Sequence, residues 1–232
     1  MGSCEQCVVR NRAICAALDV DEVGALNAIG RQRTLAPGES LIWEGDDSVL
    51  VANVIDGVLK LSTGTEDGRE QIVGMVFASD FIGRPFGSTT SHGVTALTEA
   101  TVCVFNRRDF DSFARKHPAL EHKLLERTLA ELDRTRRWML LLGRKSASEK
   151  VASFLLEMSE RTATPGCDTM LPPEQIRLDL PVSRQQIADV LGLTIETVSR
   201  QFTRLKSERV IDLPSRREVT ILNSRALAAA AG

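Results

Sequence analysis

The feature of the chain that most restricts its fold is an abrupt change of pattern near His117-Pro118. Before it, glycines recur at short intervals from Gly38 to Gly93, and apolar runs such as SLIWEG, LVANVI, VLKLST and TVCVF lie between or beside them. After it, residues 119–142 contain neither Gly nor Pro and are rich in helix-forming residues. Short strands divided by turn residues are typical of an antiparallel sandwich or barrel. We therefore expect an all-β first half followed by a long helix.

The last third of the chain has a different organisation, and 232 residues are enough for two domains. An amphipathic helix is predicted in SASEKVASFLLEMSERTA, followed by the Pro/Gly-bearing loop TPGCDTMLPPEQ. From Ile176 onward the pattern runs strand, helix, turn, helix and two short strands, and the alanine-rich tail LAAAAG is expected to be a frayed helix. We place the domain boundary near residues 143–146.

The stretch VSRQQIADVLGLTIETVSRQF predicts two short helices joined by a tight turn. Ser183 and Gln186 have the spacing of a capping box, Gly192 suits a left-handed turn position, and Thr194 can cap the second helix. Two helices joined in this way form a helix-turn-helix, a motif that places its second helix in the major groove of DNA. We expect four apolar side chains to anchor that helix: Ile195, Val198, Phe202 and Leu205.

The polar side chains of the second helix suit the edges of DNA bases. Arg200 can donate two hydrogen bonds to guanine, and Glu196 can accept one from cytosine. The alternative is an exposed ion pair between these two residues, four positions apart. Between residues 196 and 217 six basic residues outnumber three acidic ones, in a chain of net charge -2. The predicted DNA-contacting residues are Glu196, Thr197, Ser199, Arg200 and Thr203 of the helix, with Arg216 and Arg217 at the turn of the final hairpin.

Three of the five cysteines, Cys4, Cys7 and Cys15, lie within the first fifteen residues. The chain has no signal peptide pattern and no run of eighteen apolar residues, so we expect a cytoplasmic protein without a membrane partner, whose thiols stay reduced. Clustered reduced thiols favour a metal or redox site, and such a site needs a fourth ligand. Cys103, in a predicted strand, is the candidate, unless it is a small buried core residue. We interpret Cys167 as incidental.

These features together resemble the cAMP receptor protein/FNR superfamily. The features that carry the resemblance are the glycine-punctuated β region, the helix ending in WMLLLGRK, the motif LGLTIETVSR and the leading cysteines with one more in the β region. Within that superfamily the chain is similar to the FNR branch, in particular to the FnrL/FnrN-like oxygen-responsive regulators of alphaproteobacteria. The similarity extends over essentially the whole chain.

The resemblance implies an α+β fold with a jelly-roll-like double-stranded β-helix of the cyclic-nucleotide-binding type, a long dimerisation helix and a winged helix-turn-helix. The expected segments are a cysteine-rich cluster-binding segment (1–22), a β-roll sensor domain (23–116), the dimerisation helix (117–145) and the DNA-binding domain (146–232). Six residues of the long helix follow a spacing that places them on one stripe. By spacing alone the stripe would pack against the chain's own domain, whereas the resemblance implies that it forms the interface of a homodimer. The stripe consists of Leu125, Thr128, Leu132, Thr135, Met139 and Leu142.

The resemblance also implies a function. A four-iron, four-sulfur (4Fe-4S) cluster that oxygen destroys would be held by Cys4, Cys7, Cys15 and Cys103. The motif E-x-x-S-R, here Glu196, Ser199 and Arg200, implies palindromic sites with TTGAT-type half-sites. Contacts to RNA polymerase would come from β-roll loops near Asp80, and the protein would act mainly as an activator.

Three features qualify this expectation. The stretch FIGRPFGSTTSHGVTAL lacks the Glu and the Arg that cyclic-nucleotide receptors place there, so we expect no cyclic nucleotide. Seven residues separate Cys7 from Cys15, as in the alphaproteobacterial form. Thr135 stands where the enterobacterial form has an acidic residue, so cluster loss can cause either monomer formation or reorientation.

Other functions stay open within and outside this class. A related regulator could sense nitric oxide or another signal, with cysteines that bind structural zinc or no metal. An enzyme is not expected, because the β region has no glycine-rich nucleotide fingerprint and no set of acids and histidines suggests a catalytic pocket.

Overall fold

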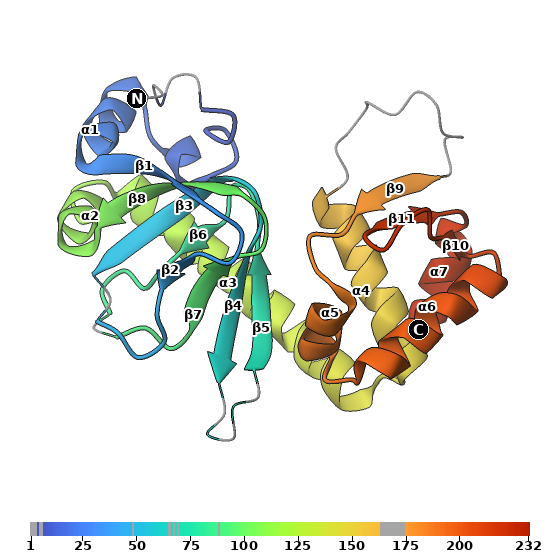
Figure 1. Ribbon diagram of the computed structural model, residues 1–232. Helices are drawn as coiled ribbons and strands as arrows, with labels where there is room; N and C mark the ends of the chain where they lie inside the picture. Colours follow the sequence, from blue (N-terminus) through green and yellow to red (C-terminus); the bar gives the residue numbers. More distant parts are fainter. Residues whose placement is uncertain are drawn as a thin grey trace. The chain divides into compact units, whose positions relative to one another are not determined.

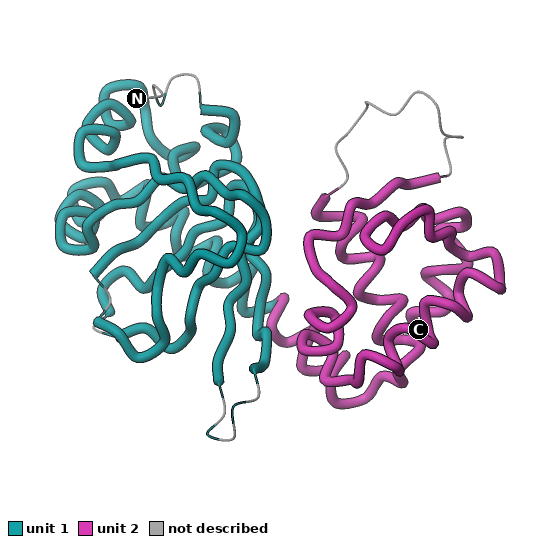
Figure 2. Tube along the Cα trace, in the orientation of Figure 1, with its two compact units in different colours: residues 1–133 teal, residues 134–232 magenta. Residues whose placement is uncertain are grey.

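The computed structural model contains two compact units, residues 1–133 and 134–232 (Figure 2). It describes residues 4, 7–47, 49–64, 66, 68, 70–87, 89–162 and 175–232, so Cys167 lies outside the described residues. The division between the units falls inside the long helix α3 (Pro118–Arg144), which occupies the Gly/Pro-free stretch and confirms the predicted helix. No helix among the described residues is long and apolar enough to span a bilayer.

Two four-stranded antiparallel sheets form the core of the first unit (Figure 1). One has the order β1 (Gly30–Leu35), β8 (Ala100–Asn106), β3 (Leu50–Asp56) and β6 (Phe81–Ile82). The other has the order β2 (Ser40–Ile42), β7 (Gly93–Ala96), β4 (Leu59–Gly64) and β5 (Glu70–Val76). Apolar side chains from both sheets make one core, which includes Leu35, Val54, Leu59, Val94 and Val102. The predicted all-β half is confirmed.

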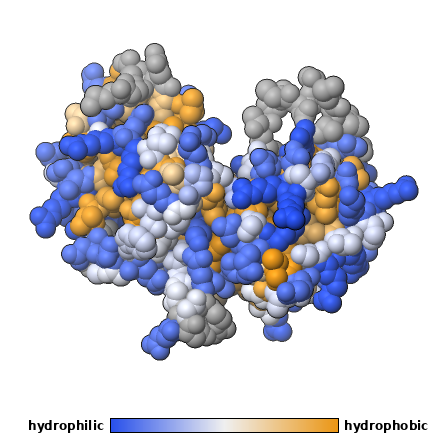
Figure 3. Space-filling model, viewed as in Figure 1, coloured by the Kyte–Doolittle hydropathy of each residue, from blue (hydrophilic) through white to orange (hydrophobic). Residues whose placement is uncertain are grey.

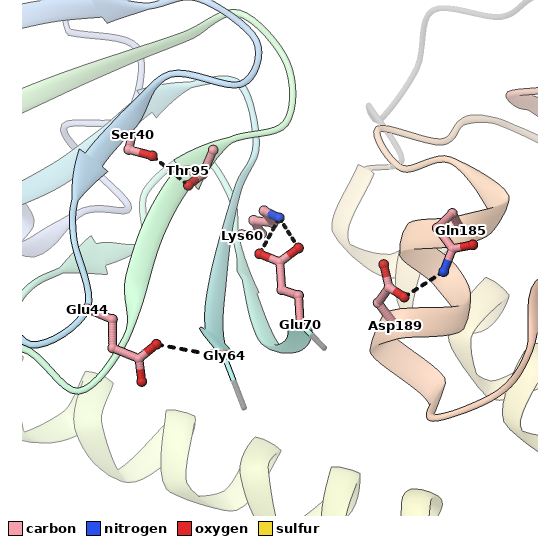
Figure 4. Close-up of polar contacts among 8 residues, drawn as sticks. All are labelled: Ser40, Glu44, Lys60, Gly64, Glu70, Thr95, Gln185 and Asp189. Atoms are coloured by element: carbon pink, nitrogen blue, oxygen red, sulfur yellow. Dashed lines mark hydrogen bonds and ion pairs between the residues drawn. The ribbon is translucent and has the colours of Figure 1, made fainter. Parts of the chain in front are cut away.

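The glycine pattern has a steric reason at the turn between β3 and β4. Gly57 has a φ of 85°, a conformation that L side chains rarely adopt, and a Cβ there would lie 2.3 Å from the carbonyl oxygen of Glu99. Polar pairs link neighbouring strands of the second sheet (Figure 4). Ser40 and Thr95 join β2 to β7 at 3.0 Å, and Lys60 bridges to Glu70 across β4 and β5 at 2.6 Å.

Helices cover the outer face of the first sheet. They are the 3₁₀ helix η2 (Ile14–Ala17), α1 (Val20–Ile29), α2 (Arg107–Ala114) and the start of α3. Their apolar side chains form a second core with Val51 and Phe105 of the sheet, and this core includes Ile14, Leu26, Phe110, Leu120 and Leu124. Phe110 packs between Phe81 and Phe105 with its ring tilted to both, and the ring centroids are 5.4 and 5.6 Å away. The N-terminal segment is therefore fixed to the sheet by burial of its own apolar residues.

The second unit surrounds α4 (Ala147–Thr162) with short elements. These are β9 (Ile176–Asp179), α5 (Arg184–Leu191), α6 (Ile195–Ser207), β10 (Ile211–Asp212), β11 (Glu218–Ile221) and α7 (Ser224–Ala231). The three strands form one antiparallel sheet in the order β10, β11, β9. The alanine-rich tail is helix α7, whose Leu227 and Ala231 are buried, so the expected fraying is wrong.

Hydrophilic side chains cover much of the surface visible in Figure 3, with small hydrophobic patches between them. The chain thus combines a β domain, a long helix and a second unit of helices with a three-stranded sheet, which confirms the α+β architecture. The bounds of the four predicted segments stay predictions, although α1 crosses the expected boundary at residues 22–23.

Candidate metal centre and nucleic-acid interface

All four candidate metal ligands line one cavity of the first unit. The cavity has a volume of about 440 Å³, and its wall includes Cys4, Cys7, Cys15 and Cys103. Cys103 lies on β8, and the other three come from the N-terminal segment that covers this face of the sheet. All four are free thiols. The structure thus brings together residues that are up to 99 positions apart in the sequence.

Backbone hydrogen bonds between residues close in sequence shape the segment that carries the first cysteines. The amide of Arg10 donates to the carbonyl of Cys7 at 3.1 Å, and the amide of Ala13 donates to that of Val9 at 2.8 Å. Val9, Ala13 and Ile14 are buried. The apolar residues of this turn therefore attach it to the fold, while the cysteines on either side of them line the cavity.

The thiols are strongly biased toward their protonated form when no metal is bound. Burial, followed by the charges of Cys4 and Cys7, raises the pKa of Cys15 to about 11. Burial and the neighbouring cysteines raise the pKa of Cys103 to about 12. Burial and Cys7 also raise the pKa of Cys4, an effect that Arg10 partly offsets. A cationic occupant would reverse this preference, because metals bind thiolates and displace their protons.

The described residues contain no group of three or more His, Cys, Asp or Glu side chains arranged to hold a metal ion. The four thiols instead lie around a shared space. Four cysteine thiolates are a donor set used both by iron-sulfur clusters and by structural zinc sites.

Two asparagines that sequence analysis missed contact the cysteines. Asn27 of α1 accepts a hydrogen bond from Cys4 Sγ at 3.0 Å, and Asn53 of β3 donates through Nδ2 to Cys15 Sγ at 3.7 Å. Asn53 is also the direct cross-strand partner of Cys103. No local pattern indicates these roles, because each depends on which strands and helices become neighbours.

The cysteine segment contacts the long helix as well as the sheet. The Arg127 guanidinium of α3 donates to the carbonyl oxygen of Arg12. Ile14 and Leu18 share a core with Leu120 and Leu124 of α3. A change in the path of the cysteine segment would therefore alter the packing and a hydrogen bond of α3.

Helix α3 exposes an apolar stripe. All six residues of the predicted stripe are exposed in the structure, and Met139 reaches an exposed fraction of 69%. Leu129 and Leu140, which the analysis missed, are exposed beside it. Their position among the leucines of the same helix was the signal that could have identified them.

The helix-turn-helix forms as predicted. Ser183 accepts a hydrogen bond from the Gln186 amide at 3.2 Å, and the Gln186 side chain accepts one from the Ser183 amide at 2.8 Å. Gly192 is left-handed at φ 61°, and Thr194 caps α6 through the Thr197 amide at 3.3 Å. Gln185 and Asp189 add a hydrogen bond of 2.8 Å along α5 (Figure 4). The caps and the turn are confirmed.

The two faces of α6 separate as expected, with one correction. Val198, Phe202 and Leu205 are buried, but Ile195 is 37% exposed, so three apolar residues anchor the helix rather than four. Ile195 lies in the first turn, where the capping turn leaves its side chain uncovered. The predicted contact residues Glu196, Ser199, Arg200 and Thr203 are exposed, whereas Thr197 is partly buried and also contacts the Thr194 hydroxyl.

The alternative pairing of Glu196 with Arg200 is absent from the described interactions of these residues. The Glu196 pKa is lowered by hydrogen bonds from its own backbone amide and from Thr194. The wider positive stretch is partly neutralised, because Arg204 pairs with Glu208 at 2.8 Å and Lys206 with Asp212 at 3.0 Å.

The turn between β10 and β11 carries two of the predicted contact residues, and Arg184 of α5, which was not predicted, packs against α6. Strands β10 and β11 pair antiparallel, and Arg216 and Arg217 are exposed in the turn between them. Arg184, at the start of α5, stacks over the Phe202 ring with its guanidinium carbon 3.4 Å from the centroid. Burial lowers the Arg184 pKa to about 10.

Asp80, expected near a polymerase contact, has a local structural role. Its carboxylate accepts a hydrogen bond from the Phe77 amide at 3.0 Å and stabilises the turn between β5 and β6.

Comparison with known proteins gives a consistent result over both units. Residues 149–230 match the Crp-like helix-turn-helix domain, and residues 32–117 match the cyclic nucleotide-binding domain. The chain is 43% identical over 229 residues to the transcriptional activator protein FnrL of Cereibacter sphaeroides, covering 99% of this chain and 92% of that protein. It is 40% identical to the nitrogen fixation regulation protein FixK of Bradyrhizobium diazoefficiens, covering 90% of this chain and 85% of that protein.

The fold is similar to a solved structure, that of FixK2 from Bradyrhizobium japonicum. The TM-score is 0.79 at 29% identity, covering 88% of this chain and 98% of that chain.

Proposed function

Because the chain belongs to the Crp/Fnr family of DNA-binding transcriptional regulators, we propose that it is an oxygen-responsive regulator, mainly an activator, that works in the cytoplasm. It binds palindromic TTGAT-type sites as a homodimer while Cys4, Cys7, Cys15 and Cys103 hold an iron-sulfur cluster of the 4Fe-4S type. RNA polymerase is its partner at activated promoters, and no cyclic nucleotide is required.

The single observation that carries this proposal is the shared cavity of the four cysteines. Cysteine thiolates are the usual ligands of iron-sulfur clusters, and the cavity of about 440 Å³ gives space to a group larger than one ion. The bound cluster would supply redox chemistry sensitive to oxygen. The chain supplies three ligands from a segment that sequence alone would leave loosely held and one from a rigid strand.

The contacts of that segment explain how cluster loss can reach the DNA-binding surface. Arg127 holds the Arg12 carbonyl, and Leu120 and Leu124 pack against Ile14 and Leu18. When the cluster is lost, its bonds no longer hold the cysteine segment, which forms one partner in these contacts. The N-terminal part of α3 then loses a hydrogen bond and apolar partners, and α3 carries the exposed stripe that we assign to the dimer.

The dimer and the DNA contacts rest on exposed side chains. An apolar stripe along a 27-residue helix is the pattern that a second helix covers in a coiled coil. A dimer with two recognition helices requires two half-sites about one helical turn apart. Arg200, exposed and without an ion pair among the described residues, is the side chain best suited to read guanine.

Anaerobic purification tests the proposal directly. We expect a brown protein whose iron and sulfide content approaches four of each per chain and whose visible absorbance bleaches in air. Cys103→Ser should be colourless, whereas the matched Cys167→Ser should be as brown as the original chain. A colourless protein that contains zinc and is indifferent to air would contradict the proposal.

A further inference from the structure

Asn53 is a buried polar residue in the wall of the cysteine cavity. Its exposed fraction is 2%, and it lies in the middle of β3 among apolar residues of the sheet. A buried side-chain amide weakens a core unless its groups are hydrogen-bonded. The position of Asn53 therefore calls for a reason other than packing.

The hydrogen bonds of Asn53 are unequal. Nδ2 donates to Cys15 Sγ at 3.7 Å, while Oδ1 is buried without a hydrogen-bond partner among the described residues. An unsatisfied buried oxygen is costly, and a leucine of similar size would avoid it. In Asn53 the N–H group is hydrogen-bonded and the oxygen is not. We infer that the role of this side chain depends on its N–H donors.

The geometry sets Asn53 between two cysteines. It is paired across the strands with Cys103, whose other cross-strand partner is Gln32 of β1, so the three residues share one face of the sheet and all line the cavity. Cys15 comes from the covering segment. Asn53 thus lies on the strand next to the one that carries Cys103, and its side chain reaches the sulfur of Cys15.

The amide presents its N–H group to the Cys15 sulfur, which is the orientation that a thiolate requires. A thiolate sulfur can only accept hydrogen bonds, so an amide turned the other way would place oxygen against sulfur. Hydrogen bonds to ligand sulfurs offset negative charge and raise the reduction potential of an iron-sulfur cluster.

We propose that Asn53 is a positioning residue that donates an N–H hydrogen bond to the Cys15 sulfur and thereby slows loss of the cluster in air. This inference rests on the proposed function, because it requires that the cysteines hold a cluster. Asn53 acts through Cys15 and is not itself a ligand.

The test compares Asn53→Leu with Gln32→Leu. Both positions line the cavity beside Cys103, but Gln32 is not seen to hydrogen-bond any described cysteine. Anaerobically loaded proteins are exposed to air, and the bleaching rate and the midpoint reduction potential are measured. We expect Asn53→Leu to bleach about threefold to tenfold faster and to have a lower potential, with Gln32→Leu close to the original chain.

Two further variants keep the test decisive. Asn53→Asp has the same shape without a donor and should bleach at least as fast as Asn53→Leu; it replaces that variant if the leucine form does not load. Asn53→Gln retains the amide and should recover part of the lifetime. Thermal unfolding of the metal-free forms checks that the fold is intact.

The outcomes separate the two proposals. If the original chain is colourless, the proposed function is wrong. If it is brown but Asn53→Leu and Asn53→Asp keep its lifetime and potential, the role of Asn53 is overturned. Equal acceleration in Gln32→Leu would also overturn it, because the effect would then follow cavity size and not the hydrogen bond.

Discussion

Gly30, at the start of β1, lines the cysteine cavity at a point where the packing leaves no room for a side chain. A Cβ at this residue would lie 2.6 Å from Cε1 and 3.2 Å from Cδ1 of Phe105, and 3.3 Å from Cys103 Sγ. Phe105 is buried and packs against Phe110, so its ring has little room to move. The backbone of Gly30 is extended, with a φ of -100°, so it would accept alanine without backbone strain.

The expected cost of Gly30→Ala follows from these distances. Overpacking of a dense core destabilises by about 1–3 kcal/mol, and the loss of glycine freedom in the unfolded chain offsets about 0.4–1 kcal/mol. We expect the free energy of unfolding to fall by about 1 kcal/mol, and by no more than about 2.6 kcal/mol. Because the added Cβ would also crowd Cys103 Sγ at 3.3 Å, the proposed cluster should be loaded less completely than in the original chain.

The loss of stability is measured by urea unfolding of the metal-free protein, monitored by circular dichroism. The loss of cluster loading is measured as iron content after anaerobic loading. Gly24→Ala is the matched control, since a Cβ at that exposed position in α1 meets nothing within 4 Å. It should raise stability by about 1 kcal/mol. A Gly30→Ala protein with unchanged stability and full iron content would refute the description of this cavity wall.

Four further predictions concern the other sites. Arg200→Ala should weaken binding to the cognate duplex by about 1–3 kcal/mol in a fluorescence anisotropy titration, and an unchanged affinity would remove its assigned role. Met139→Glu should shift the anaerobic protein from dimer to monomer in sedimentation velocity, because it places a charge in the exposed stripe of α3; a persistent dimer would argue for another interface. Ser183→Ala should lower the free energy of unfolding by about 1 kcal/mol through loss of the capping box, and a smaller change in thermal melts would show that the cap contributes little. In the metal-free protein at pH 8, iodoacetamide should label Cys15 about a hundredfold and Cys103 about a thousandfold more slowly than free cysteine, since only the thiolate reacts and their pKa values are raised to about 11 and about 12. Labelling at the rate of free cysteine, seen by peptide mass spectrometry, would contradict the burial of these thiols.

The same pKa shifts give a sign for the pH dependence of stability. A thiol whose pKa is raised by folding favours the folded state while it is protonated. For Cys15 and Cys103 this contribution is present below the ordinary pKa of 9.0 and is lost as the pH rises through about 11 to about 12.

The sequence predicted best those features that are decided within a few residues. The capping box of Ser183 and Gln186, the left-handed Gly192 and the Thr194 cap each involve atoms no more than four residues apart, so local sequence determines them. The long helix was predicted for the same reason. Ile195 was placed wrongly because helical periodicity assigns a face but cannot tell where the neighbouring helix ends.

Features that depend on long-range pairing were harder to predict. The role of Asn53 requires β3 to pair with β8 in a particular register and the N-terminal segment to cover that pair. The contact of Arg127 with Arg12 joins residues 115 positions apart. The alanine-rich tail has weak local signals and is ordered by packing against α4. The need for a fourth ligand made Cys103 a candidate, but only the resemblance assigned it to the other three cysteines, because spacing in the sequence does not bring them together.

The central claim is that the state of the four-cysteine site controls specific DNA binding. Its most direct test is the affinity of the anaerobic protein for a TTGAT-N4-ATCAA duplex, measured by anisotropy as air is admitted while the cluster absorbance is recorded in the same cuvette. We predict that specific affinity and absorbance fall together, while Cys103→Ser binds weakly before and after air. A protein that keeps its full affinity after its absorbance has bleached would contradict the account.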